Sequence, residues 1–137
     1  MDEPLDSSQA LARRWFQKAE NDLLNVQNNL QAERYASDTV CFHCQQAAEK
    51  YLKGFLVWHQ TSFDRPHDLL ELLEQVKQIT GADDKVLANH LSLLDPYAVS
   101  ICYPQAHESE PDGPQVLQAV GAAYAVRAWV RARLKSE

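Results

Sequence analysis

The segment CFHCQQAAEK, residues 41–50, gathers side chains that bind metals, bind phosphates or transfer protons. It places His43 between two cysteines and follows them with two amides, a carboxylate and an ammonium group. Thiolates and imidazoles are zinc ligands, whereas a histidine near a lysine suits phosphate chemistry. The side of the helix on which each residue lies decides between these two kinds of site.

Helical geometry separates the cysteines from the histidine. Residues 38–58 have the apolar spacing of a helix, in which neighbouring residues are about 100° apart. Cys41 and Cys44 belong to its apolar side. The polar side holds four residues that form hydrogen bonds or carry charge: His43, Gln46, Lys50 and Lys53. A structural zinc site needs four converging ligands, and mid-helix cysteines do not supply the tight turn typical of such pairs. We therefore expect two core thiols, and no metal or other cofactor.

The polar side of this helix has two interpretations. A solvated face explains a histidine, an amide and a lysine at helical spacing without any function. The same residues could instead bind a phosphate or a partner helix, with Lys50 as a point charge and His43 and Gln46 as hydrogen-bonding groups. Asp22, at the edge of the preceding apolar stripe, could face Lys50 across two helices or pair with Lys18 on its own helix.

The rest of the chain predicts the elements that position these residues. Four glycines and few alternating apolar patterns indicate an all-α protein. The first predicted helix follows an N-cap at Ser7 or Ser8, and the second opens after a cap at Ser37 or Asp38 and ends at about Trp58. The third runs from just after Pro66 to Gly81, the fourth covers 84–94 before Pro96, and the last runs from about Pro114 to Lys135. Short connections predict an up-and-down antiparallel bundle of four to five helices. It would form one domain over residues 7–135, after a disordered start at 1–6.

Composition restricts the classes of function. The 137 residues carry a net charge of −6, so binding of nucleic acid would need a local basic groove rather than overall charge. The best such cluster is Arg127, Arg131 and Arg133, although a solvated helix face explains these arginines equally well. The acidic start and the short apolar runs predict a cytoplasmic protein that does not enter a membrane, with its three cysteines reduced.

Four segments in order resemble the HEPN (higher eukaryote and prokaryote nucleotide-binding) domain family, over about residues 12–134. They are WFQKAENDLLNV, CFHCQQAAEKYLKGFL, RPHDLLELLEQV and PYAVSICYP, and the pattern FHxQQAAEKxLK is the most specific part. The resemblance implies an all-α bundle, usually a homodimer, often encoded beside a minimal nucleotidyltransferase as a toxin–antitoxin-like pair. Many members of the family are metal-independent ribonucleases.

The ribonuclease members carry an arginine and a histidine, separated by four to six residues, at the start of the last long helix or just before it. The histidine serves as general base or acid toward a ribose hydroxyl, and the arginine holds the scissile phosphate. The corresponding segment here is CYPQAH, in which His107 matches and Cys102 stands at the position of the arginine. Since cysteine supplies neither a permanent charge nor a forked donor, we expect the catalytic site to be degenerate.

Two functions follow from the resemblance. The first is a dimeric, catalytically degenerate module that binds a nucleotide or a nucleotidyltransferase partner. The second is a ribonuclease toxin that uses His107 on RNA, with Lys50 or Lys53 in place of the arginine. Two other residues are candidates for ligand contacts. The first is His67, although either it or Asp68 could instead cap the third helix. The second is Tyr103, which could stack on a base.

Overall fold

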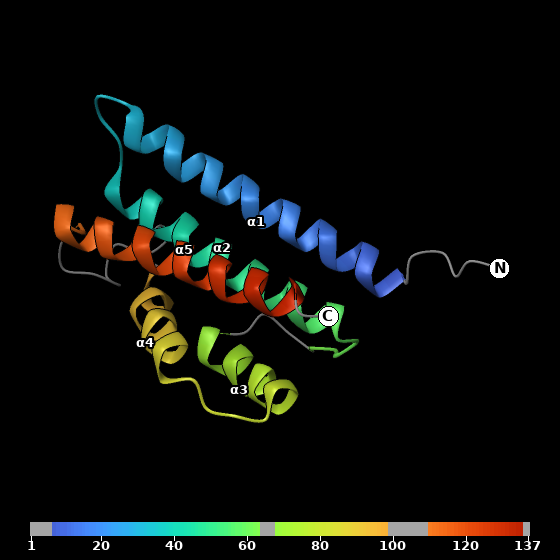
Figure 1. The fold of residues 1–137 in the computed structure, drawn as a ribbon. Coiled ribbons are helices and arrows are strands. Elements are labelled where there is room, and N and C mark those ends of the chain that lie inside the picture. The colour runs from blue at the N-terminus through green and yellow to red at the C-terminus, as the bar shows by residue number, and fades with distance from the viewer. Residues whose placement is uncertain (1–6, 64–67, 99–109, 136–137) are drawn as a thin grey trace.

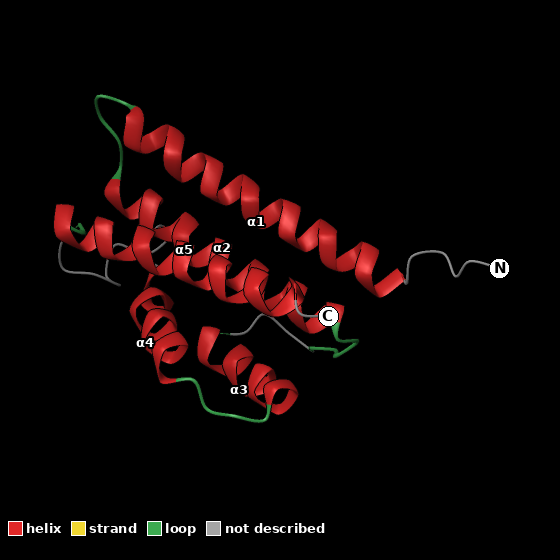
Figure 2. Cartoon of the chain, in the orientation of Figure 1, coloured by secondary structure: helices red, strands yellow, loops and turns green. Residues whose placement is uncertain are grey.

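The computed structural model describes residues 7–63, 68–98 and 110–135. They form the helices α1 (Ser7–Gln31), α2 (Ser37–Trp58), α3 (Leu69–Thr80) and α4 (Lys85–Leu94), the short 3-10 helix η1 (Asp95–Ala98), and α5 (Gly113–Lys135). Figure 2 shows only helices and loops in this part of the chain. The predicted all-α bundle is confirmed. No helix within the described ranges combines the length and the apolar composition needed to cross a membrane.

Helix α2 lies at the centre of the bundle and contacts every other element. Figure 1 shows that α1 and α2 run antiparallel, joined by the loop at residues 32–36. Helix α5 lies along α2 in the same direction, and α3 and α4 come between these two helices in the chain. Neighbours on several sides bury α2 more widely than one apolar stripe predicts, and its buried residues include Gln45, Lys53 and Gly54.

Local signals place the ends of α3. Asp68 and Glu71 form a capping box, in which the Asp68 side chain accepts from the Glu71 amide at 2.8 Å. Asp95 accepts a second hydrogen bond, at 2.9 Å, from the amide of Leu69 and so joins the end of α4 to the start of α3. Gly81 ends the helix in the left-handed conformation, with φ of 78°. The predicted cap at Asp68 and the predicted end at Gly81 are both confirmed.

The other predicted helix starts are less accurate. Helix α1 already includes Ser7, and the N-cap of α2 is Ala36, which forms no side-chain hydrogen bond. Serine caps at these two places are therefore wrong. Helix α4 ends before Pro96 as predicted, although the chain continues there as η1. Pro114 lies in the first turn of α5, where its missing amide hydrogen has no helical partner to lose.

Gly54 allows α1 to approach α2 closely. A Cβ atom at this position would lie 2.3 Å from Cε1 of Phe16, so the ring of Phe16 occupies the space of a side chain. The same ring stacks on Tyr51, with centroids 6.1 Å apart and an angle of 25° between the planes. The position of Phe16 is therefore fixed by a glycine on one side and an aromatic ring on another.

We predict that Gly54→Ala lowers the free energy of unfolding by about 1–3 kcal/mol, because the added methyl group overlaps the Phe16 ring. Gly121→Ala in α5 is the matched control, since no atom lies within 4 Å of the Cβ that it adds. This control should keep or raise stability, by up to about 1 kcal/mol, through the higher helix propensity of alanine. Urea unfolding measures both, and equal stabilities of the two variants would contradict the predicted contact.

Candidate functional site

A carboxylate between α1 and α2 holds two of the polar residues that the sequence singled out. Asp22 Oδ1 lies 2.8 Å from His43 Nδ1, and Asp22 Oδ2 lies 2.7 Å from Lys50 Nζ. Asp22 is only 7% exposed, whereas His43 and Lys50 are partly exposed. Pairing of Asp22 with Lys50 across the two helices, one of the two alternatives considered, is confirmed. The side of α2 that could have been a solvated face therefore lies against α1.

This arrangement limits the chemistry of the cluster. An ionised Asp22 accepts the hydrogen of His43 Nδ1, which leaves Nε2 as the basic nitrogen of the neutral ring. A histidine oriented in this way can exchange a proton. The charge of Lys50, however, is balanced by the same carboxylate. The cluster thus offers an oriented imidazole but no cation whose charge is available to a phosphate.

The amides and the carboxylate of the same segment form a chain of hydrogen bonds along α2. Gln46 Nε2 donates to Gln45 Oε1 at 2.7 Å, and Gln45 Nε2 donates to Glu49 Oε1 at 3.3 Å. Gln45 is buried, and Gln46 and Glu49 are partly exposed. Each amide nitrogen thus has a partner within α2, and a ligand contact of Gln46 stays a prediction.

Lys53 is buried, in contrast to its predicted place on a polar side. It is 7% exposed, and its Nζ donates to Glu49 Oε2 at 2.8 Å. The rings of Trp15 and Phe63 cover the ammonium group, with centroids 5.5 and 5.3 Å from Nζ. The prediction failed because α1 and the residues after α2 extend over a face that sequence spacing alone assigns to solvent.

The two cysteines lie in the core, as predicted. Cys41 and Cys44 are fully buried, and their burial raises the pKa of the thiols to about 11 and about 12. A hydrogen bond between Cys41 and Tyr97 partly opposes the rise in the pKa of Cys41. Both thiols therefore stay neutral at physiological pH and are poor nucleophiles. The described residues contain no group of three or more His, Cys, Asp or Glu side chains placed to hold a metal ion.

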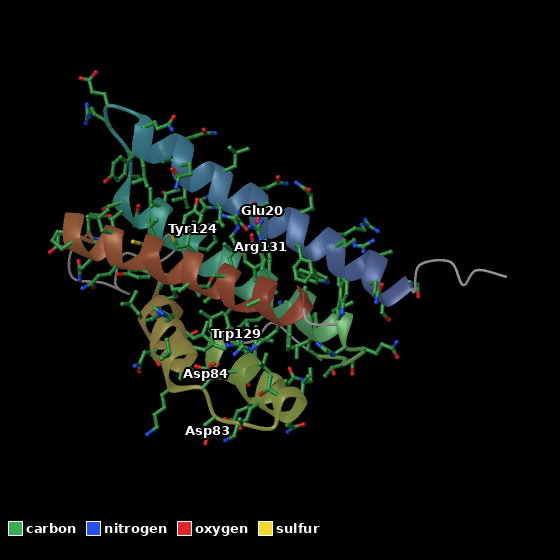
Figure 3. All side chains as sticks on the ribbon, in the orientation of Figure 1. Glu20, Asp83, Asp84, Tyr124, Trp129 and Arg131 are labelled. Carbon is green, nitrogen blue, oxygen red and sulfur yellow. The ribbon has the colours of Figure 1, made fainter. Side chains whose placement is uncertain are left out.

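A second charged cluster joins α1 to α5. Glu20 Oε2 accepts a hydrogen bond from the hydroxyl group of Tyr51 and another, at 3.1 Å, from Arg131 Nη2. Arg127 Nε lies 3.1 Å from the same oxygen. In Figure 3, Glu20 of α1 and Arg131 of α5 face the same space between the two helices. Burial, together with the hydrogen bond to Glu20, raises the pKa of the Tyr51 hydroxyl group.

Arg133 belongs to a different side of α5, so a single cluster of three arginines is wrong. Its guanidinium carbon lies 3.9 Å from the centroid of the Trp129 ring, and its Nη2 lies 3.6 Å from Asp84 Oδ2. Trp129 Nε1 donates to the same carboxylate at 2.8 Å, near the start of α4 (Figure 3). A backbone amide of α4 and the Trp129 indole lower the pKa of Asp84. The contacts of Arg133 and Trp129 with Asp84 connect α5 to the start of α4 and are separate from the Glu20 cluster.

Sequence spacing could have found only part of the Glu20 cluster. Arg127 and Arg131 are four residues apart, which places them on one face of a helix. Glu20 and Tyr51 come from two other helices, and their convergence depends on how those helices are rotated about their axes. Four predicted site residues lie outside the described residues, and their roles stay predictions: His67, Cys102, Tyr103 and His107.

Comparison with known proteins agrees with the all-α fold and with the family resemblance. The family model of the HEPN domain matches residues 12–133. This chain belongs to the HEPN domain family. The crystal structure of TT1696 from Thermus thermophilus is similar, with a TM-score of 0.75 and 28% sequence identity over 88% of this chain and 95% of that chain. No curated protein shows a significant match.

Proposed function

We propose that this HEPN domain is catalytically degenerate and binds a nucleotide or an RNA phosphate without cleaving RNA. We further propose that it acts as a homodimer beside a nucleotidyltransferase partner in a toxin–antitoxin-like pair, as its resemblance to paired family members implies. The first support is the sequence, which has Cys102 where ribonuclease members have the arginine of their motif.

The observation that carries the proposal is that both lysines of α2 are already paired. Lys50 is bound by the buried carboxylate of Asp22, and Lys53 is bound by Glu49 beneath two aromatic rings. Moving either ammonium group to a substrate would leave a carboxylate without its cation in a poorly solvated place, which is costly. Neither lysine is therefore suited to replace the missing arginine. Without a cation on the phosphate, His107 alone would lose about 100- to 1000-fold in rate.

The homodimer is supported by an exposed apolar residue near the start of α5. Leu117 is 68% exposed. Helix α5 begins at Gly113, a few residues after the segment of Cys102 and His107, and in the family the two copies of this motif meet in the dimer cleft. An exposed apolar side chain near this segment suits a contact between subunits.

The catalytic part of the proposal is tested with single-stranded RNA in a buffer that contains a metal chelator. We predict that the wild-type protein cleaves RNA no faster than His107→Ala. Cys102→Arg should gain cleavage, because it restores the forked donor beside the histidine, and adding His107→Ala should abolish that gain. Wild-type cleavage that disappears in His107→Ala would contradict the proposal and support a ribonuclease toxin instead.

The dimer is tested by the mass of the protein in sedimentation experiments. Leu117→Glu is predicted to convert a dimer to a monomer, since it places a charge in an apolar contact. Val86→Glu is the matched control. Val86 is 67% exposed on α4, so this substitution should leave the mass of the protein unchanged. A wild-type monomer, or a Leu117→Glu variant that stays dimeric, would contradict this interface. Capture of the product of an adjacent nucleotidyltransferase gene tests the partner.

A further inference from the structure

A hollow of about 440 Å³ lies against one face of α5. It is lined by five residues of that helix: Tyr124, Arg127, Ala128, Arg131 and Ala132. A second hollow of about 190 Å³ shares Arg131 and is lined by Glu20 and Tyr51, so the two hollows adjoin at the Glu20 cluster. The first hollow falls within the size range of small-ligand sites. It lies toward the end of α5 that is farther from Leu117.

Both guanidinium groups at the hollow retain hydrogen-bond donors. Arg131 contacts Glu20 through Nη2, and its side chain is 53% exposed. Arg127 approaches the same carboxylate oxygen through Nε, which is buried and makes no hydrogen bond within the described part of the chain. Each guanidinium group carries five N–H donors in a planar fork. Contacts through one nitrogen of each group therefore leave the other nitrogens for an anion.

Tyr124 adds a neutral donor to the same hollow. Gln27 Nε2 of α1 donates to the Tyr124 hydroxyl oxygen at 2.9 Å, so this oxygen acts as an acceptor and its own hydrogen can be donated elsewhere. The Arg127 guanidinium carbon lies 5.4 Å from the centroid of the Tyr124 ring. The hydroxyl group and the two cations thus belong to one lining.

Charge and shape both favour a phosphate in this hollow. Two arginines against the single carboxylate of Glu20 leave a local positive charge, although the whole chain carries −6. Ala128 and Ala132 are exposed and small, so they leave room beside the guanidinium groups. Arginine forks match phosphate oxygens with two parallel hydrogen bonds.

We propose that Tyr124, Arg127 and Arg131 bind a phosphate group of a nucleotide or of RNA in the hollow on this face of α5. The inference rests on the proposed function for its class of ligand and adds the site at which that ligand binds. Free nucleotides and RNA present the same phosphate chemistry, and separate probes distinguish them.

Calorimetric titration with inorganic pyrophosphate, adenosine triphosphate and a short single-stranded RNA tests the site on the whole chain. Arg131→Gln should weaken binding by roughly tenfold or more, because it removes a charged donor. Arg131→Lys should restore only part of the affinity, since lysine keeps the charge without the fork. Ala128→Leu should weaken binding by filling the hollow while every charge stays in place. Arg34→Gln, an equal loss of charge in the exposed loop before α2, should bind like the wild type.

The outcomes separate the site from the proposed function. If Ala128→Leu abolishes the binding of pyrophosphate and adenosine triphosphate, the ligand of the hollow is a free nucleotide. If it abolishes only the binding of RNA, the ligand is RNA. Absence of binding by all three probes, or equal binding by Ala128→Leu and the wild type with both folded by circular dichroism, overturns the site. If Ala128→Leu changes the mass of the assembly in solution but not the binding of the probes, the hollow is a contact between subunits. That result also overturns the proposed phosphate site. RNA cleavage with phosphate binding intact contradicts only the degenerate catalysis.

Discussion

The buried carboxylate of Asp22 is the constraint on which the interpretation of the central helix depends. It lies in the interface of α1 and α2 and contacts both His43 and Lys50 at hydrogen-bond distance. A buried carboxylate needs such partners, because ionised groups are strongly disfavoured away from water without them. The most specific residues of the family resemblance therefore have a structural task. They hold the two antiparallel helices in one register, and the close contact at Gly54 fixes the spacing of the same helices.

The two charged clusters of α1 differ in how open they are. Around Asp22 the carboxylate is covered, and it balances the charge of Lys50. Around Glu20 the positive charge exceeds the negative charge, and Arg131 remains largely exposed beside a hollow. Ligand binding is thus better matched to the hollow on α5 than to the polar residues of α2. The proposed phosphate site uses arginines of α5 itself and does not depend on the motif position that Cys102 occupies.

The sequence predicted the helices and the core thiols because those features depend on local spacing and capping. Asp68, Gly81 and the apolar positions of α2 act within a few residues of themselves. The sequence could not predict that Lys53 is buried or that Arg133 separates from Arg131, since both depend on which neighbour covers which side of a helix. Asp22 is intermediate, because its helix position made Lys50 one of two possible partners and only the packing of α1 on α2 decided between them.

The most direct test of this account is a double-mutant cycle of Asp22→Asn and Lys50→Met, measured by urea unfolding. If Asp22 holds Lys50 across the interface, the two substitutions are coupled, and the interaction free energy should be about 1–3 kcal/mol. The cycle measures the pair itself, because the effect of each substitution on its other neighbours cancels. A coupling of zero would mean that Lys50 is not committed to Asp22. It would then be available to a phosphate, and the claim that α2 offers no free cation for catalysis would be wrong.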